Sequence, residues 1–181
     1  MASAAGKLKT DLASQQNYNH LRVVFLRKKK MQLTDHFTLA EMTASDNAVR
    51  FGIDNSASPA IQTNLLRTCQ TLELVRTVLG TKAIRINSGY RCDALNKKVG
   101  GSTTSAHSFG LAADFVCPDY GSPLSICRKI LASNIAFDQL IWEGTWVHIG
   151  LAAEGVKARM QVLTAHFSTG KPTSYTMGLP V

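Results

Sequence analysis

The segment from Ser58 to Gly80 places the strongest constraint on the fold. Ser58-Pro59 combines a helix N-cap residue with proline at the first helical position, and Gly80 suits the left-handed position that ends a helix. Between these signals, apolar residues recur at spacings of three and four: Ile61, Leu65, Cys69, Leu72, Val75 and Leu79. This period predicts a long amphipathic helix with one face against a hydrophobic core.

Shorter elements are predicted on both sides of this helix. Thr38-Leu39-Ala40-Glu41 is a capping box that begins one helix, and Ser122-Pro123 begins another through about Ala132. A further short helix is predicted over 92–99, and strands over 83–86, 111–116, 138–143, 146–151 and 159–164. Gly144-Thr145 suits a two-residue hairpin turn. Because most helices precede the run of strands, we expect an α+β fold, with helices packed on a central antiparallel sheet in a single domain.

The positive charge of the chain is concentrated at its N-terminus. Residues 1–30 hold seven basic residues and one acidic residue, which is +6 of the net charge of +8. Residues 31–181 are nearly neutral, so we expect no specific binding of nucleic acid by the folded part. We expect residues 1–30 to form a flexible basic extension, residues 31–170 the folded domain, and residues 171–181 an irregular tail.

Cysteine usage and hydropathy narrow the class of protein. The cysteines at 69, 92, 117 and 127 contain no Cys-x-x-Cys pair, which argues against a zinc knuckle; we expect buried thiols and leave their pairing open. No run of 18 apolar residues is present, so no transmembrane helix is expected. The short apolar segment 23–26 precedes the basic run 27–30, an order opposite to that of an export signal. We therefore expect the protein to be synthesised in the cytosol. We also expect it to be a monomer.

Two histidines and one aspartate have the sequence context of a metal site. His107 lies in the sequence Ser-Ala-His-Ser-Phe-Gly-Leu-Ala-Ala-Asp, which ends at Asp114, and His148 lies in Trp-Val-His. Two neutral imidazoles and one carboxylate suit zinc and leave one coordination position open for water. Gly110 allows a tight loop that brings His107 back beside Asp114 on its predicted strand.

Glu143 is the candidate general base. If Gly144-Thr145 is the hairpin turn, Ile141 pairs with His148, and Glu143 lies on the face of His148 at a diagonal distance of about 7–8 Å between backbones. A carboxylate there could take a proton from water and later pass it to a leaving amine. With a different strand register, Glu143 would be a solvated turn residue.

These motifs resemble those of a known enzyme family. Ser-x-His-x-x-Gly-x-Ala-x-Asp followed by Trp-x-His, with Ser88-Gly89-Tyr90-Arg91 before them, resembles the zinc D-alanyl-D-alanine carboxypeptidase family. That family includes D-Ala-D-Ala dipeptidases and phage endolysins that cut the L-alanyl-D-glutamate bond, and the hedgehog signalling domain is a related fold. The resemblance covers about residues 31–165. It implies a zinc metallopeptidase that hydrolyses an amide bond in the peptide part of peptidoglycan, acting in the periplasm or outside the cell.

Carried over residue by residue, the resemblance implies one zinc ion per chain, bound by His107, Asp114 and His148. It also implies Glu143 as general base and acid, and Arg91 as the cation near the scissile carbonyl or the substrate carboxylate.

The resemblance further implies that Ser105 contacts the substrate, and we expect Tyr90 and Trp146 to contact it as well. In several relatives the acidic residue stands three positions before the last histidine, where this chain has Thr145. Arg85 also carries a guanidinium and could serve in place of Arg91.

Other functions fit the same residues less well. A non-haem iron oxygenase also uses two histidines and one carboxylate, but generally places the carboxylate closer to the first histidine. A zinc deaminase requires a Pro-Cys-x-x-Cys element, which is absent. The main alternative is a non-catalytic cell-wall-binding or virion structural module on the same fold. The choice among carboxypeptidase, dipeptidase and endopeptidase stays open, and a small single-domain phage lysin of a Gram-negative host fits the domain organisation.

Overall fold

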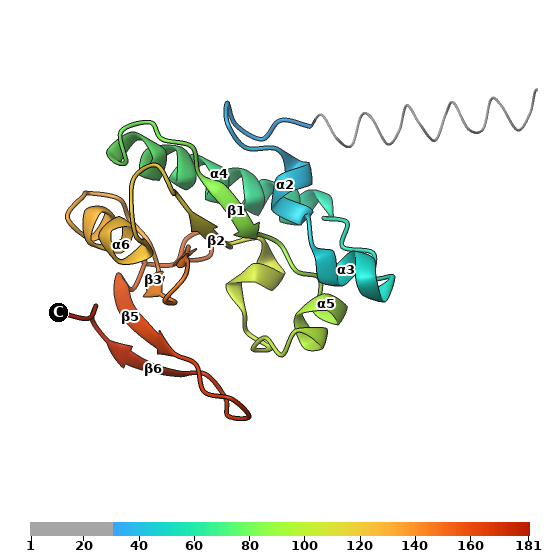
Figure 1. Ribbon diagram of the computed structural model, residues 1–181. Coiled ribbons are helices and arrows are strands. Elements are labelled where there is room, and N and C mark those ends of the chain that lie inside the picture. Colours follow the sequence, from blue (N-terminus) through green and yellow to red (C-terminus); the bar gives the residue numbers. More distant parts are fainter. Residues whose placement is uncertain (1–30) are drawn as a thin grey trace, which may run out of the picture.

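The computed structural model describes residues 31–181, so the predicted basic extension at residues 1–30 lies outside the described residues. Figure 1 shows how the elements of the described part are arranged. In chain order they are α2 (Leu39–Thr43), α3 (Asp46–Phe51), α4 (Pro59–Val78), β1 (Arg85–Ser88), α5 (Asp93–Lys98), the 3-10 turn η1 (Ala106–Phe109), β2 (Ala112–Val116), α6 (Pro123–Leu131), β3 (Gln139–Trp142), β4 (Val147–Gly150), β5 (Gln161–His166) and β6 (Ser174–Met177).

The helices begin where the sequence signals predict. The hydroxyl of Thr38 accepts the backbone N–H of Glu41, whose carboxylate accepts the backbone N–H of Thr38, so the capping box of α2 is complete. The hydroxyl of Ser58 accepts the backbone N–H of Ile61 at the start of α4, and Gly80 adopts a left-handed φ of 71° after the C-cap residue Leu79. The predicted inner face of α4 is buried at Leu65, Cys69, Leu72 and Val75. No helix within residues 31–181 is both long and apolar enough to cross a membrane.

The six strands form one sheet in the order β1-β2-β4-β3-β5-β6. The α+β class is confirmed, but the sheet is mixed rather than wholly antiparallel, because β3 and β5 run parallel. The reason is geometric. β4 ends beside the first residue of β3, because the two strands are antiparallel. The chain therefore leaves β4 at the end of the sheet where β3 starts. β5 begins at that same end and pairs with the free side of β3, so it runs in the same direction as β3.

The β3–β4 hairpin has the register that the sequence predicts. Ile141 pairs with His148 and Trp142 with Val147. The backbone N–H of Glu143 donates to the carbonyl of Trp146 at 3.1 Å, which closes a two-residue loop in which Gly144 has a φ of 74°.

Residues 171–181 are not wholly irregular, contrary to the prediction. Ser174–Met177 forms β6, which pairs with β5 as an antiparallel edge strand. All four residues are exposed, so the hydrophobic burial that marks most strands is absent here.

The helix α3 was also not predicted. It is short, and its N-cap is Ser45, whose hydroxyl accepts the N–H of Ala48.

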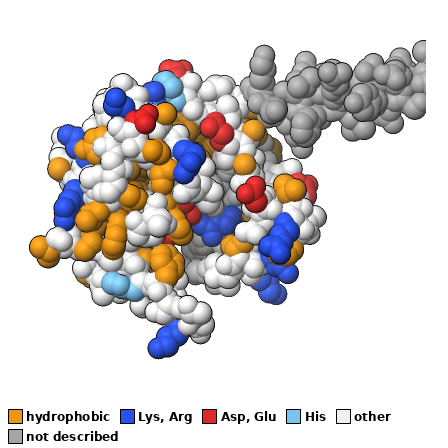
Figure 2. Space-filling view, viewed as in Figure 1, with side chains coloured by type: hydrophobic (Ala, Val, Ile, Leu, Met, Phe, Trp, Pro, Cys, Tyr) orange, Lys and Arg blue, Asp and Glu red, His pale blue; other side chains and the backbone are white. Residues whose placement is uncertain are grey.

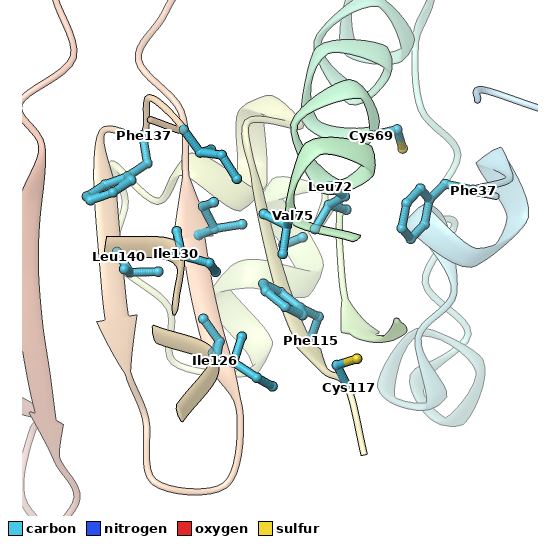
Figure 3. Close-up of a cluster of buried hydrophobic side chains, with 14 of the residues drawn as sticks. Phe37, Cys69, Leu72, Val75, Phe115, Cys117, Ile126, Ile130, Phe137 and Leu140 are labelled. Atoms are coloured by element: carbon cyan, nitrogen blue, oxygen red, sulfur yellow. The ribbon is translucent and has the colours of Figure 1, made fainter. Parts of the chain in front are cut away.

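The two faces of the sheet have different environments. One face packs against α4 and α6, and Figure 3 shows the resulting core, which includes Leu72 and Val75 of α4, Phe115 of β2, Ile130 of α6 and Leu140 of β3. Burying such a side chain contributes about 1.5–3 kcal/mol. Because side chains alternate along a strand, the residues between these core positions point to the opposite face.

The surface of the molecule carries both signs of charge. On the face shown in Figure 2, Lys and Arg side chains are interspersed with Asp, Glu and uncharged residues, and hydrophobic side chains gather on the side that carries α6 and β5.

Four cysteines are free thiols, three of them buried and Cys92 half-buried, as expected for a chain without a disulfide framework.

Candidate metal centre

Three side chains converge on the face of the sheet that α4 and α6 leave open. Asp114 on β2 and His148 on β4 are directly paired, so both point to the same side. His107 reaches them from η1. The distances are 3.2 Å from His107 Nε2 to Asp114 Oδ1, 3.2 Å from His107 Nε2 to His148 Nδ1, and 2.8 Å from His148 Nδ1 to Asp114 Oδ1.

The tight loop after η1 holds His107 in place. Gly110 has a left-handed φ of 69°, and its backbone N–H donates to the carbonyl of His107. A Cβ at position 110 would approach the backbone of Ile61 to 3.0 Å, so the loop also lies close against α4. The predicted role of Gly110, to fold His107 back beside Asp114, is confirmed.

The hydrogen bonding of His107 defines its tautomer. His107 Nδ1 lies 2.6 Å from the carbonyl oxygen of Gly89. Because a carbonyl only accepts, Nδ1 carries the proton, and Nε2 of the neutral ring directs a lone pair at Asp114 Oδ1 and His148 Nδ1. A lone pair that faces a carboxylate oxygen is unfavourable unless a cation lies between them.

The donor set fits a metal ion. Zinc binds histidine nitrogen and carboxylate oxygen at about 2.0–2.2 Å, which in tetrahedral geometry separates neighbouring ligand atoms by about 3.3–3.6 Å. The observed separations of 2.8–3.2 Å are about 0.1–0.5 Å below this range. The Nδ1–H to carbonyl bond of His107 is the kind of outer hydrogen bond that orients a metal-binding histidine.

The protonation states of the group also suit metal binding. All three residues are buried, with exposed fractions of 2% for His107 and 8% each for Asp114 and His148. Burial lowers the pKa of His107 and keeps its ring neutral. Burial alone would raise the pKa of Asp114, but the neighbouring His107 and His148 hold it well below its usual range, so the carboxylate is ionised.

Arg91 lies at the edge of this group. Its guanidinium donates to Oδ2 of Asp114 at 3.2 Å, and the ion pair is largely buried. Arg85, the competing guanidinium, lies at the exposed start of β1, where its backbone pairs with Val116. The structure therefore brings Arg91 to the site.

A buried asparagine that sequence reasoning missed fixes the backbone around Arg91. Asn55 Nδ2 donates to the carbonyl of Tyr90 at 2.9 Å, and the backbone N–H of Cys92 donates to Asn55 Oδ1 at 2.8 Å. Asn55 Nδ2 also donates to the carbonyl of Thr43, which ties this segment to α2. One amide thus holds both neighbours of Arg91.

Glu143 has the position that the hairpin register predicts. It follows Ile141 by two residues and therefore lies on the face of His148. Burial, and after it the carboxylate of Asp114, raises the pKa of Glu143, against opposing contributions from His148, Trp146 and Arg91. The charges of Asp114 and His148 thus influence the ionisation of Glu143.

The predicted substrate-contacting residues have different locations. Trp146 lies two residues before His148 on the same face of the sheet, and its ring is 6.0 Å from that of Phe167, an exposed residue that sequence reasoning missed. Ser105 is half-buried at the start of η1. Tyr90 belongs to the hydrophobic core cluster that also contains Met42, and its contact with substrate stays a prediction.

Comparison with known proteins agrees with this arrangement. A family model described as Peptidase M15 matches residues 35–150. The chain belongs to this family. The matched range contains His107, Asp114, His148, Glu143 and Arg91, whereas β5 and β6 lie beyond it.

A curated relative of this M15 family member is the zinc D-Ala-D-Ala carboxypeptidase of Streptomyces albus G. The two are 34% identical over 110 residues, which make up 60% of this chain and 41% of the relative. The chain therefore matches less than half of the length of that protein.

Proposed function

We propose that this member of the peptidase M15 family is a zinc-dependent peptidase that hydrolyses an amide bond in the stem peptide of bacterial peptidoglycan. The observation that carries the proposal is the convergence of His107 Nε2, Asp114 Oδ1 and His148 Nδ1 to within 3.2 Å of one another, on the face of the sheet that Glu143 shares. The relative from Streptomyces albus G, whose name specifies zinc and the D-Ala-D-Ala substrate, supports this choice of metal and substrate.

His107, Asp114 and His148 would hold one zinc ion per chain. Bound there, zinc supplies a Lewis acid that polarises the scissile carbonyl and makes water nucleophilic at neutral pH. The three ligands come from η1, β2 and β4, so two of them lie on directly paired strands and the third on the neighbouring 3-10 turn.

Glu143 acts as the general base and then as the general acid. Its carboxylate accepts a proton from the attacking water and returns that proton to the nitrogen of the leaving amine. Because the pKa of Glu143 is raised toward neutral pH, its carboxylate accepts a proton more readily and its carboxylic acid form can still donate that proton to the amine. One side chain therefore both accepts and returns the proton, and no covalent bond forms between the protein and the substrate.

Arg91 supplies a fixed positive charge to the same site. Its guanidinium is held by Asp114 on one side and presents its remaining donors to the oxyanion that develops on the scissile carbonyl, or to the substrate carboxylate. Trp146, two residues before His148, and Ser105, directly before η1, contact the peptide.

The reaction is tested by mass spectrometry of purified muropeptides after incubation with the zinc-loaded protein. Loss of one terminal alanine identifies a carboxypeptidase, and cleavage into two peptide fragments identifies an endopeptidase. The Glu143→Gln variant, loaded with zinc, serves as the matched control and should leave the muropeptides intact. Muropeptides that bind but stay intact with the unaltered protein would instead support the non-catalytic wall-binding module.

A further inference from the structure

The strand register places a continuous row of side chains across the open face of the sheet. Asp114 is paired with His148, His148 with Ile141, Ile141 with Leu163, and Leu163 with Met177. Because directly paired residues point to the same side, this row leads from two of the metal ligands, across β3 and β5, to the edge strand β6.

A second row lies beside the first. Glu143 follows Ile141 by two residues, and Ala165 follows Leu163 by two residues on the parallel strand β5. Tyr175 is paired with Ala165. Glu143 and Tyr175 therefore share the open face, with β5 between their strands.

These rows form an apolar strip that ends in exposed side chains. Ile141, Leu163 and Ala165 are a small buried cluster of their own, separate from the main core. On β6, by contrast, Tyr175 is 50% exposed and Met177 is 74% exposed. We call these five residues the β6 strip. Its three inner members are buried, so only Tyr175 and Met177 present apolar surface to a ligand. An exposed apolar edge on the same face as a catalytic site is suited to binding a ligand that extends from that site.

The phenol of Tyr175 is electrostatically linked to the site. Burial raises the pKa of Tyr175 above its ordinary value, and the carboxylates of Glu143 and Asp114 raise it further. The hydroxyl therefore stays protonated at neutral pH. A protonated phenol can donate a hydrogen bond to a peptide carbonyl while its ring packs on apolar groups.

We propose that the β6 strip, with Tyr175 as its main contact, binds the part of the stem peptide that lies on the N-terminal side of the cleaved bond. The inference rests on the proposed function and deepens it. Arg91 flanks Asp114 from the β1 side of the sheet, so a substrate whose carboxyl end lies near Arg91 extends its other end toward β6.

The length of the strip defines which substrate residues it contacts. Three strand spacings separate β4 from β6. At about 4.8 Å per spacing this is about 14 Å, or about four residues of extended peptide. Tyr175 therefore contacts a residue at least two positions before the cleaved bond, and short substrates do not reach it.

The test is a comparison of binding by a long and a short peptide. The protein carries Glu143→Gln and is loaded with zinc, so that bound peptides are not cleaved. Dissociation constants are measured for a stem pentapeptide ending in D-Ala-D-Ala and for acetyl-D-Ala-D-Ala. Adding Tyr175→Ala should weaken binding of the pentapeptide about tenfold and change binding of the short peptide less than twofold.

Ser174→Ala is the matched control, because Ser174 is the neighbouring exposed residue on β6 and points to the opposite face. It should change neither dissociation constant. Tyr175→Phe should recover most of the affinity if ring packing dominates. An unchanged pentapeptide affinity in Tyr175→Ala, equal weakening for both peptides, or a pentapeptide that does not bind would each overturn the inference.

The same measurement separates this inference from the proposed function. Hydrolysis is assayed independently with the unaltered protein. If that protein cleaves no stem peptide but the Tyr175→Ala change still weakens pentapeptide binding, the hydrolase proposal fails and the binding strip stands. If cleavage occurs and binding is insensitive to Tyr175, the strip fails and the hydrolase proposal stands.

Discussion

Arg91 donates a hydrogen bond to Oδ2 of Asp114, the carboxylate oxygen that the two histidines do not contact. Asp114 therefore joins the metal group to a fixed cation through its two oxygens. This arrangement lets one carboxylate orient the guanidinium through Oδ2 while Oδ1 stays directed at the two histidines.

We expect Arg91→Ala to lower kcat/KM for stem peptide about 100- to 1,000-fold, because the charge that faces the developing oxyanion is lost. Zinc content should stay near one per chain at saturating zinc. Arg85→Ala is the control, since Arg85 is exposed on β1, and should change kcat/KM less than twofold. The assignment is wrong if Arg85→Ala reduces activity and Arg91→Ala does not.

Glu143→Gln is expected to lower kcat about 100- to 10,000-fold, because an amide cannot accept the proton of water. The side chain keeps its size, so zinc content and melting temperature should not change. Steady-state kinetics on stem peptide together with metal analysis check both expectations. Glu154→Gln, at an exposed carboxylate, should be kinetically silent. Retention of full activity in Glu143→Gln would remove Glu143 from the mechanism.

Asn55 is expected to act through Arg91. Asn55→Ala removes the hydrogen bonds to Tyr90 and Cys92 and should lower kcat/KM about tenfold, because Arg91 loses its fixed backbone position. The decisive measurement is a double-mutant cycle. In an Arg91→Ala background, Asn55→Ala should cause no further loss of kcat/KM. Equal losses in both backgrounds would indicate general destabilisation only.

The ion pair between Asp138, directly before β3, and Arg159, two residues before β5, predicts a pH-dependent contribution to stability. Asp138 accepts hydrogen bonds from the guanidinium and the backbone N–H of Arg159, and these lower the pKa of Asp138 below its ordinary value of 3.8. A carboxyl group whose pKa is lowered on folding stabilises the folded protein at pH values above its ordinary pKa. This stabilisation is lost as the pH falls through the lowered pKa.

Asp138→Asn should therefore lower the melting temperature at pH 7 by about 2–4 °C, which corresponds to about 1 kcal/mol for a pair whose arginine is largely exposed. The difference from the unaltered protein should shrink as the pH is lowered below 3.8. Asp119→Asn is the control at an exposed carboxylate. A difference that grows toward acid pH would contradict the assignment.

Much of this fold could be predicted because its signals are local. The helix starts at Thr38, Ser58 and Ser122 depend on hydrogen bonds within one turn, which the sequence displays directly. The register of the β3–β4 hairpin follows from a two-residue loop at Gly144, and this register is enough to place Glu143 on the face of His148.

The features that sequence reasoning missed depend on contacts between distant segments. Asn55 and Cys92 are 37 residues apart, and nothing near Asn55 in the sequence indicates that it supports the backbone around Arg91. Tyr90 adjoins Arg91 in the motif, but its ring enters the core. β6 has no buried face, so Tyr175 could not be assigned to the open face until the pairing with β5 was known.

Metal analysis tests the central claim most directly. The protein is stripped with a chelator, reloaded with zinc, desalted and measured by mass spectrometry of the metal. We expect about one zinc per chain in the unaltered protein, and strongly reduced zinc in His107→Ala, Asp114→Ala and His148→Ala, because each removes one of the three converging ligand atoms. His166→Ala, at a histidine on β5 that bonds to Thr176, should retain full zinc. Full zinc content in all three ligand variants would contradict the account.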